Sequence, residues 1–303
     1  MRPHKEQDYF AYILLLSLGV IWGGQFLFNT NAVRYFPPAT VAAIRALIGA
    51  LTLTIAACWI PEKSCTDSRP ISLALLFIAL AFFEAVLPLF LIVWGQQHID
   101  SSITSVIVAS VPMITLLLSI FLSKNRHFTF ASGLSIALGF VGIIVLMKPS
   151  GSSLNWNNWI YELAIFGGVF SFAIALLLFE KIPHGTPIRS VRNILWIASL
   201  PLTIAAAFLD KPWKLHWNLD GMIALLILGT AASGLAYVLY GMLIQRSGPI
   251  FASISNFIVP LVGVFLGIIV CGDHFGAKEV AALVLIIAAL AAYNLNSLSK
   301  SKS

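Results

Sequence analysis

Charged side chains are scarce in this sequence. Asp, Glu, Lys and Arg make up only 10% of the 303 residues, whereas hydrophobic residues make up 59%. Soluble domains carry about one quarter charged residues, so this composition excludes a large soluble domain. Apolar runs of about 20 residues have the length that a helix needs to cross the hydrocarbon core of a bilayer. The sequence therefore predicts an integral membrane protein.

Residues for metal, redox and phosphate chemistry are also few. The three cysteines, Cys58, Cys65 and Cys271, form neither a CxxC motif nor a zinc-binding spacing. The histidines lie in predicted loops, tails or span ends, and the chain has no P-loop and no paired-carboxylate motif. We therefore expect no metal centre and no cofactor, and a polytopic membrane enzyme is the remotest alternative.

The excess of positive charge does not indicate nucleic acid as a partner. Formal net charge is +6, but the basic residues are scattered among loop ends, and no aromatic and basic platform is present. The partners that we expect are the lipid bilayer, a small-molecule substrate and, for coupling, protons.

Long apolar runs are what the chain has in abundance. We interpret ten of them as transmembrane helices joined by short links. The first run is too long for a cleavable signal peptide, and no small-residue cleavage site follows it. The predicted spans are approximately 9–28, 38–60, 71–94, 101–123, 128–147, 159–180, 189–209, 219–243, 249–271 and 276–295.

Lysine and arginine predict the orientation of the chain, because cytoplasmic segments carry an excess of these residues. If the amino terminus is cytoplasmic, the cytoplasmic segments contain more lysine and arginine than the segments on the outside. Both termini are then cytoplasmic, including a short basic tail over 297–303. The inside set is Arg2, Lys5, Lys63, Arg69, Lys124, Arg126, Lys181, Arg189, Arg246, Lys300 and Lys302, and the outside set is Arg34, Lys148, Lys211, Lys214 and Lys278.

The chain repeats its own pattern at an offset near 148 residues. GQQHIDSSITSVIVASVP, which ends at Pro112, lies over LIQRSGPIFASISNFIVP, which ends at Pro260, and Gly19 lies over Gly168 at an offset of 149. Each half has five predicted spans, an odd number, so the second half enters the membrane inverted. Inverted repeats are typical of transporters with a midplane substrate site, although apolar helices also resemble one another by chance. The predicted repeats are 1–148 and 149–296.

Several short motifs occur in a characteristic order. They are IWGGQF in the first span, the spacing from Pro38 to Arg45, VP at 111–112 and 259–260, and GLSIALGFVG near the end of the first half. This order resembles the EamA-type family of the drug/metabolite transporter superfamily. The resemblance implies two inverted five-helix repeats and a secondary carrier of small metabolites, whose members often export amino acids or related compounds.

One position departs from that family pattern. Members usually carry Gly-Glu after the fourth span, where this chain has Lys124 and Asn125. The second repeat keeps an acid there, Asp273. The resemblance implies that this position caps a helix, so the departure is not expected to abolish transport.

One carboxylate interrupts the third apolar run. Glu84 stands near its middle, and Pro88 follows four residues later. Because proline has no N–H group, the carbonyl of residue 84 loses its usual helical donor. Ionisable groups at this depth are tolerated only where they face protein or a water-filled cavity, so Glu84 is a functional candidate. Three roles are open: it binds a substrate ammonium, it carries the coupling proton, or it pairs with Arg45 or another polar neighbour to fix packing.

Arg45 lies well inside the second span. It binds a substrate carboxylate through its two-pronged guanidinium, or it has a structural role in snorkelling or helix packing. The resemblance places arginine here in members with different substrates, which favours the structural role. Pro112 and Pro260 break the fourth and ninth spans, and Pro260 frees the carbonyl of Asn256. Paired breaks indicate a binding site, with simple kinks as the alternative.

Polar and aromatic residues of other spans complete the candidate site. Trp22 and Gln25 share a deep face of the first span, where an indole can attract a cation or simply pack. The eighth span carries a hydroxyl and two tyrosines on one stripe, which suits a polar cavity or helix–helix hydrogen bonding. Ser171 is expected to bond within its own helix. The candidate substrate-binding residues are Trp22, Gln25, Glu84, Ser233, Tyr237, Tyr240 and Asn256.

The sequence as a whole predicts a secondary transporter in a bacterial inner membrane. It would move small organic metabolites, such as amino acids or amines, by alternating access, with export as the expected direction. The alternatives are import or exchange of a nucleoside-like metabolite or drug, and a channel is disfavoured because no charged ring is present. The repeat makes a complete pathway plausible in a monomer, and a homodimer is the other expectation.

Overall fold

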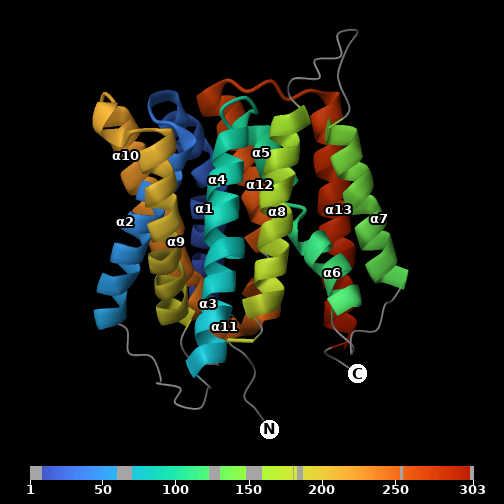
Figure 1. The fold of residues 1–303 in the computed structure, drawn as a ribbon. Coiled ribbons are helices and arrows are strands. Elements are labelled where there is room, and N and C mark those ends of the chain that lie inside the picture. Colours follow the sequence, from blue (N-terminus) through green and yellow to red (C-terminus); the bar gives the residue numbers. More distant parts are fainter. Residues whose placement is uncertain are drawn as a thin grey trace.

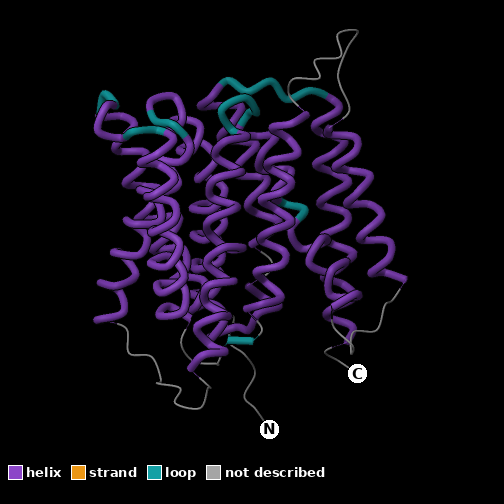
Figure 2. Tube along the Cα trace, in the orientation of Figure 1, coloured by secondary structure: helices purple, strands orange, loops and turns teal. Residues whose placement is uncertain are grey.

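The structure is a computed structural model that describes residues 9–59, 70–122, 130–147, 159–179, 181–182, 187–252 and 255–300. Over these residues it is all-helical and contains no strand (Figure 2). Most helices run side by side along one direction and form a bundle (Figure 1). The helical fold predicted from composition is confirmed.

The helices follow the apolar runs closely. In the first half they are α1 (Tyr9–Tyr35), α2 (Pro38–Trp59), α3 (Pro70–Leu80), η1 (Ala81–Val86), α4 (Leu87–Gly95), α5 (Ser101–Val108), α6 (Val111–Leu122) and α7 (Phe130–Met147). In the second half they are α8 (Trp159–Phe179), α9 (Pro187–Leu209), η2 (Pro212–Lys214), α10 (Leu219–Ile227), η3 (Leu228–Leu235), α11 (Ala236–Ala252), α12 (Ser255–Leu266), η4 (Gly267–Cys271) and α13 (Ala277–Lys300).

Six described helical stretches are long and apolar enough to cross a membrane, and shorter apolar helices accompany them. The protein is therefore a multi-pass membrane protein. The predicted span over 101–123 is not one helix, because the chain turns at Ala109 and Ser110 between α5 and α6. Pro112 is the second residue of α6, where a missing N–H group costs little. The six long stretches are Tyr9–Tyr35, Pro38–Trp59, Leu73–Gly95, Trp159–Phe179, Ile188–Leu209 and Leu219–Leu243.

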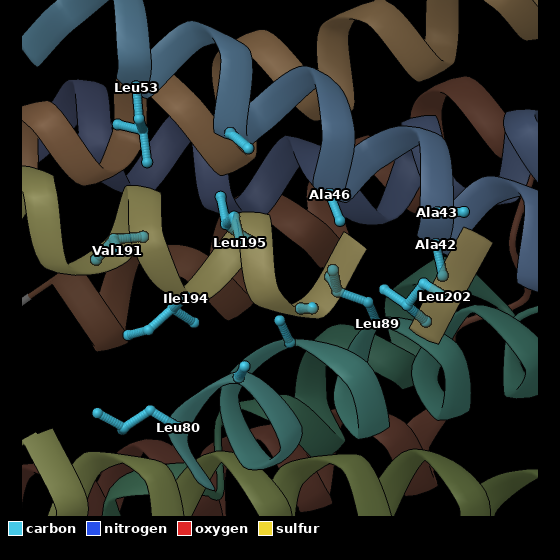
Figure 3. Close-up of a cluster of buried hydrophobic side chains, with 14 of the residues drawn as sticks. Ala42, Ala43, Ala46, Leu53, Leu80, Leu89, Val191, Ile194, Leu195 and Leu202 are labelled. Carbon is cyan, nitrogen blue, oxygen red and sulfur yellow. The ribbon is translucent and has the colours of Figure 1, made fainter. Parts of the chain in front are cut away.

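Helices from different halves pack closely against each other. The main such pairs are α2 with α9, α7 with α13, α1 with α12, and α4 with α8. Figure 3 shows one of these contacts, in which Ala42 and Ala46 of α2 lie near Leu202 of α9 and Leu89 of α4. Small residues let helix backbones approach closely, which is the main source of van der Waals contact between helices in a bilayer.

Three described segments are wound as π-helices, η1, η3 and η4. In η1 the bond that closes the last turn runs from the N–H of Leu87 to the carbonyl of Phe82, five residues back, and Pro88 follows directly. In η3 the N–H of Ala236 donates to the carbonyl of Ala231 in the same way. Single π-helical turns inside α-helices frequently mark functional sites.

Two carboxylates from the second half cap helices of the first half. Asp210 Oδ2 accepts from the backbone N–H and the hydroxyl of Thr40, at 2.6 and 2.8 Å, in the first turn of α2. Asp273 Oδ2 accepts from the hydroxyl of Ser101 and the N–H of Ser102, at 2.8 and 2.9 Å, at the start of α5. The cap expected at Asp273 is therefore present, and the helix that it caps belongs to the other half.

Candidate functional site

Glu84 lies in η1 with 9% of its surface exposed. Its Oε1 atom accepts a 2.7 Å hydrogen bond from the hydroxyl of Tyr237, which is in α11. Its Oε2 atom is buried and has no hydrogen-bond partner among the described residues. Two kinds of packing partner were considered for this carboxylate, Arg45 and another polar neighbour. The structure shows the polar neighbour, Tyr237, and in the described part of the chain Glu84 forms no ion pair with Arg45.

Arg45 is the centre of a second polar group and is 6% exposed. Its Nε donates to Ser233 Oγ at 2.9 Å, its Nη1 to Asn29 Oδ1 at 3.2 Å and its Nη2 to Gln25 Oε1 at 2.6 Å. These acceptors lie on η3 and α1, so one side chain of α2 joins three helices. The described geometry excludes snorkelling and leaves both the structural role and a substrate contact open.

The polar group extends through two amides that sequence reasoning did not select. Asn29 donates from Nδ2 to Gln96 Oε1 at 2.9 Å, and Gln96 donates from Nε2 to the carbonyl of Phe26 at 3.1 Å. Both amides are buried. Asn29 could have been found from its position four residues after Gln25 on one helical face. Gln96 gave no such signal, because it reads as the polar end of a span.

Trp22 joins the first helix to η3. Its Nε1 donates to the carbonyl of Ala232 at 3.3 Å, and its ring lies 5.9 Å from that of Tyr237 and 5.4 Å from that of Tyr240. The predicted aromatic residues of the first and eighth spans are thus brought together. Through Tyr237 this aromatic cluster also contacts Glu84.

Ser171 corrects a prediction. It does not bond within its own helix: its hydroxyl donates to the carbonyl of Phe83 in η1, at 2.7 Å. Since α-helical carbonyls normally accept from their own helix, the π-helical winding of η1 offers a carbonyl that a neighbouring helix can use.

The remaining candidates lie in α12. Asn256 is in its first turn, and its side chain is outside those that the structure describes. Pro260 is buried inside the helix. The predicted contribution of Asn256 to a substrate site therefore stays a prediction.

A small cavity lies between α1, α2, α4, α5 and α8. It has a volume of about 30 Å³, and its polar wall is formed by Gln25, Asn29 and Arg45. Pro88, Val108 and Phe172 contribute to its apolar wall. This volume suits a few water molecules at most and not a whole metabolite. The described conformation is therefore closed around the site, and the cavity wall does not include Glu84.

Comparisons with known proteins agree with this architecture. The model of the EamA-like transporter family matches residues 9–148 and 159–295. The chain is 28% identical over 281 residues to "Uncharacterized inner membrane transporter YedA" of Escherichia coli (strain K12), covering 91% of this chain and 88% of that protein. It is 24% identical over 277 residues to "Protein PagO" of Salmonella typhimurium, covering 91% and 90%.

A solved structure titled "Crystal structure of protein" superimposes with a TM-score of 0.64 over 93% of this chain and 97% of the other, at 16% identity. That likeness concerns the fold alone. The family match, in contrast, extends over nearly all of the described helices. Together with the buried polar centre between its helices, this match shows that the chain belongs to the EamA-like transporter family.

Proposed function

We propose that this protein is a secondary transporter that moves small organic metabolites across a bacterial inner membrane by alternating access. The observation that carries the proposal is the buried polar centre. Arg45 and Glu84 lie within apolar, membrane-crossing helices. Arg45 bonds to Ser233 of η3 and Glu84 bonds to Tyr237 of α11, both in the opposite half. Ionisable groups at this depth mark substrate or ion pathways.

The proposed architecture is ten transmembrane helices in two inverted repeats, 1–148 and 149–296, with both termini cytoplasmic. Two features support it. The π-helical segments η1 and η3 coincide at the offset near 148 residues, because 81–86 maps within 228–235. Each of the main helix pairs also joins one helix of the first half to one helix of the second, as expected of a molecule that rocks between two near-mirror states.

Within this mechanism Glu84 is the proposed proton carrier. Tyr237 holds one carboxylate oxygen, while the other has no partner among the described residues. A proton can therefore join Oε2 without displacing the tyrosine. Trp22, Tyr237 and Tyr240 surround this region with aromatic surface that suits an organic cation.

The proposed substrates are amino acids, amines or related compounds, and export is the proposed direction. Import or exchange of a nucleoside-like metabolite or drug is the alternative within the same mechanism. Because one chain contains both halves of the polar centre, we propose that a monomer holds a complete pathway, whether or not it also forms a homodimer.

The test uses purified protein in lipid vesicles. A metabolite panel is first screened by thermal stability, because a ligand that binds only the folded state raises Tm. Stabilising compounds are then assayed for counterflow, with Glu84→Gln beside wild type and Glu279→Gln, an acid outside the polar centre, as matched control. We expect saturable counterflow in all three proteins and loss of accumulation driven by a pH gradient in Glu84→Gln only. Flux that neither saturates nor shows counterflow would contradict a carrier.

A further inference from the structure

Arg45 is a buried cation without a described counterion. All three of its bonded acceptors, on Ser233, Asn29 and Gln25, are neutral oxygens. A guanidinium group has five N–H donors and stays protonated, so two donors remain beyond these three bonds. A buried charge that is hydrogen-bonded but not neutralised is unfavourable, and an approaching anion relieves that cost.

Arg45, Gln25 and Asn29 form the polar wall of the cavity. Gln25 and Asn29 turn their carbonyl oxygens toward the guanidinium, and the Asn29 amide nitrogen is taken by Gln96. Gln25 is on the same wall, and its amide nitrogen is a group that can donate. The described lining carries no carboxylate: Glu84 is not part of the wall, and Pro88, Val108 and Phe172 are apolar there.

We propose that this cavity is the site for a carboxylate group of the substrate, bound by the free N–H groups of Arg45 together with Gln25. Planar carboxylates match the guanidinium fork, which binds both oxygens at once. A volume of about 30 Å³ admits the head group alone, so the remainder of the substrate enters when the helices separate. This inference rests on the proposed transport function and adds that the substrate is an organic acid or an amino acid with a free carboxylate.

The first experiment uses the smallest probe that the cavity admits. Acetate and acetamide have nearly the same shape and differ in charge. We expect acetate to raise the Tm of the full-length protein saturably, relative to chloride at equal ionic strength, whereas acetamide does not. Equal effects of acetate, acetamide and chloride would overturn the proposal.

Variants at Arg45 then locate the effect. Arg45→Lys keeps the positive charge but loses the fork, and we expect its apparent affinity for acetate to fall roughly tenfold or more. Arg45→Met should lose the response entirely. Because Arg45 joins three helices, Arg45→Met is paired with Ser233→Ala, which removes one bond of Arg45 and leaves it beside the cavity. An unchanged acetate response in Arg45→Lys contradicts the proposal.

Matched larger ligands separate this inference from the transport function. The set comprises 3-phenylpropanoate, its amide, phenylalanine, phenylalaninamide and phenethylamine. Counterflow confined to the carboxylates supports the inference, and the ratio of phenylalanine to 3-phenylpropanoate tells an amino acid carrier from a carrier of simple organic acids. Counterflow of the amides and the amine equal to that of the acids leaves the carrier intact and overturns the carboxylate site.

Discussion

Trp22 and Ser171 occupy corresponding places in the first helix of each half, at the offset of 149 residues that also relates Gly19 to Gly168. Each donates a hydrogen bond to a carbonyl in the π-helical segment of the opposite half. Trp22 reaches Ala232 in η3 at 3.3 Å, and Ser171 reaches Phe83 in η1 at 2.7 Å. Each half therefore donates one side-chain hydrogen bond to a backbone carbonyl of the other half, from an indole in the first half and from a serine hydroxyl in the second.

The side chains around these two contacts differ strongly. The indole of Trp22 packs against the rings of Tyr237 and Tyr240. Next to the short Ser171, Phe172 borders the cavity. Glu84 in η1 corresponds to Ala232 in η3, so only one segment carries an acid. Under the proposed mechanism two near-mirror states need a nearly symmetric backbone, whereas a metabolite has no such symmetry, so we expect the side chains around its site to differ between the two halves.

The largest expected effect comes from overpacking at the corresponding glycines of the two halves, Gly19 and Gly168. A Cβ atom at Gly19 would lie 2.5 Å from Ile258, and one at Gly168 would lie 2.8 Å from Ile92. We expect Gly19→Ala and Gly168→Ala each to lower stability by about 1–3 kcal/mol through overpacking, measured by thermal unfolding in detergent. Gly24→Ala, whose Cβ would meet its nearest neighbour at 3.7 Å, is the control and should be nearly neutral.

A smaller effect on stability is expected at Glu84, the acid of η1 that has no counterpart in η3. The bond between Glu84 and Tyr237 should show a coupling free energy of at most about 1.7 kcal/mol, the upper end measured for bonds between membrane helices. The measurement is a double-mutant cycle of Glu84→Gln and Tyr237→Phe. Additive single effects would mean that the two groups do not stabilise each other.

The two corresponding bonds themselves can be compared directly. Ser171→Ala removes one donor, and we expect a loss near about 0.6 kcal/mol. Trp22→Phe removes one donor and also part of the ring that packs against Tyr237 and Tyr240, so we expect the larger loss there. Ser199→Ala is a suitable control, because Ser199 bonds within its own helix, to Trp196. A loss for Trp22→Phe no larger than that for Ser171→Ala would reverse the comparison.

The smallest expected effect concerns Asp100, whose counterpart in the second half is Gly248. Burial first, and next the carboxylate of Asp273, raise the pKa of Asp100 above its ordinary value, with Glu279 adding to the shift and His274 opposing it. A raised folded-state pKa means that stability is lost as pH rises through that value. Asp100→Asn should therefore raise Tm slightly at pH 7, and the gain should vanish below about pH 4. A gain that persists in acid would point to a different cause.

The helices could largely be predicted from the sequence, because the bilayer fixes the length of an apolar run. The depth of Glu84 and the position of Pro88 were readable for the same reason. The π-helical winding could not be predicted, and neither could the close packing of η3 against α2. There, Cβ atoms at Gly229 and Gly234 would run into Ile48 and Thr52.

Hydrogen-bond partners on other helices could also not be predicted from the sequence. A lone serine bonds its own helix by default, so nothing local indicated that Ser171 reaches Phe83 in another helix. Gln96 looked like a span end, yet it is buried against Asn29. The candidate residues could be identified individually from the sequence. The hydrogen bonds that join them could not, because they form only when the two halves pack together.

The caps that Asp210 and Asp273 place on α2 and α5 carry a consequence for synthesis at the ribosome. Both carboxylates come from the second half and satisfy first-turn groups of the first half. During translation the earlier helices reach the membrane before their caps exist. We therefore expect the first turns of α2 and α5 to gain these partners only after the second half has been made.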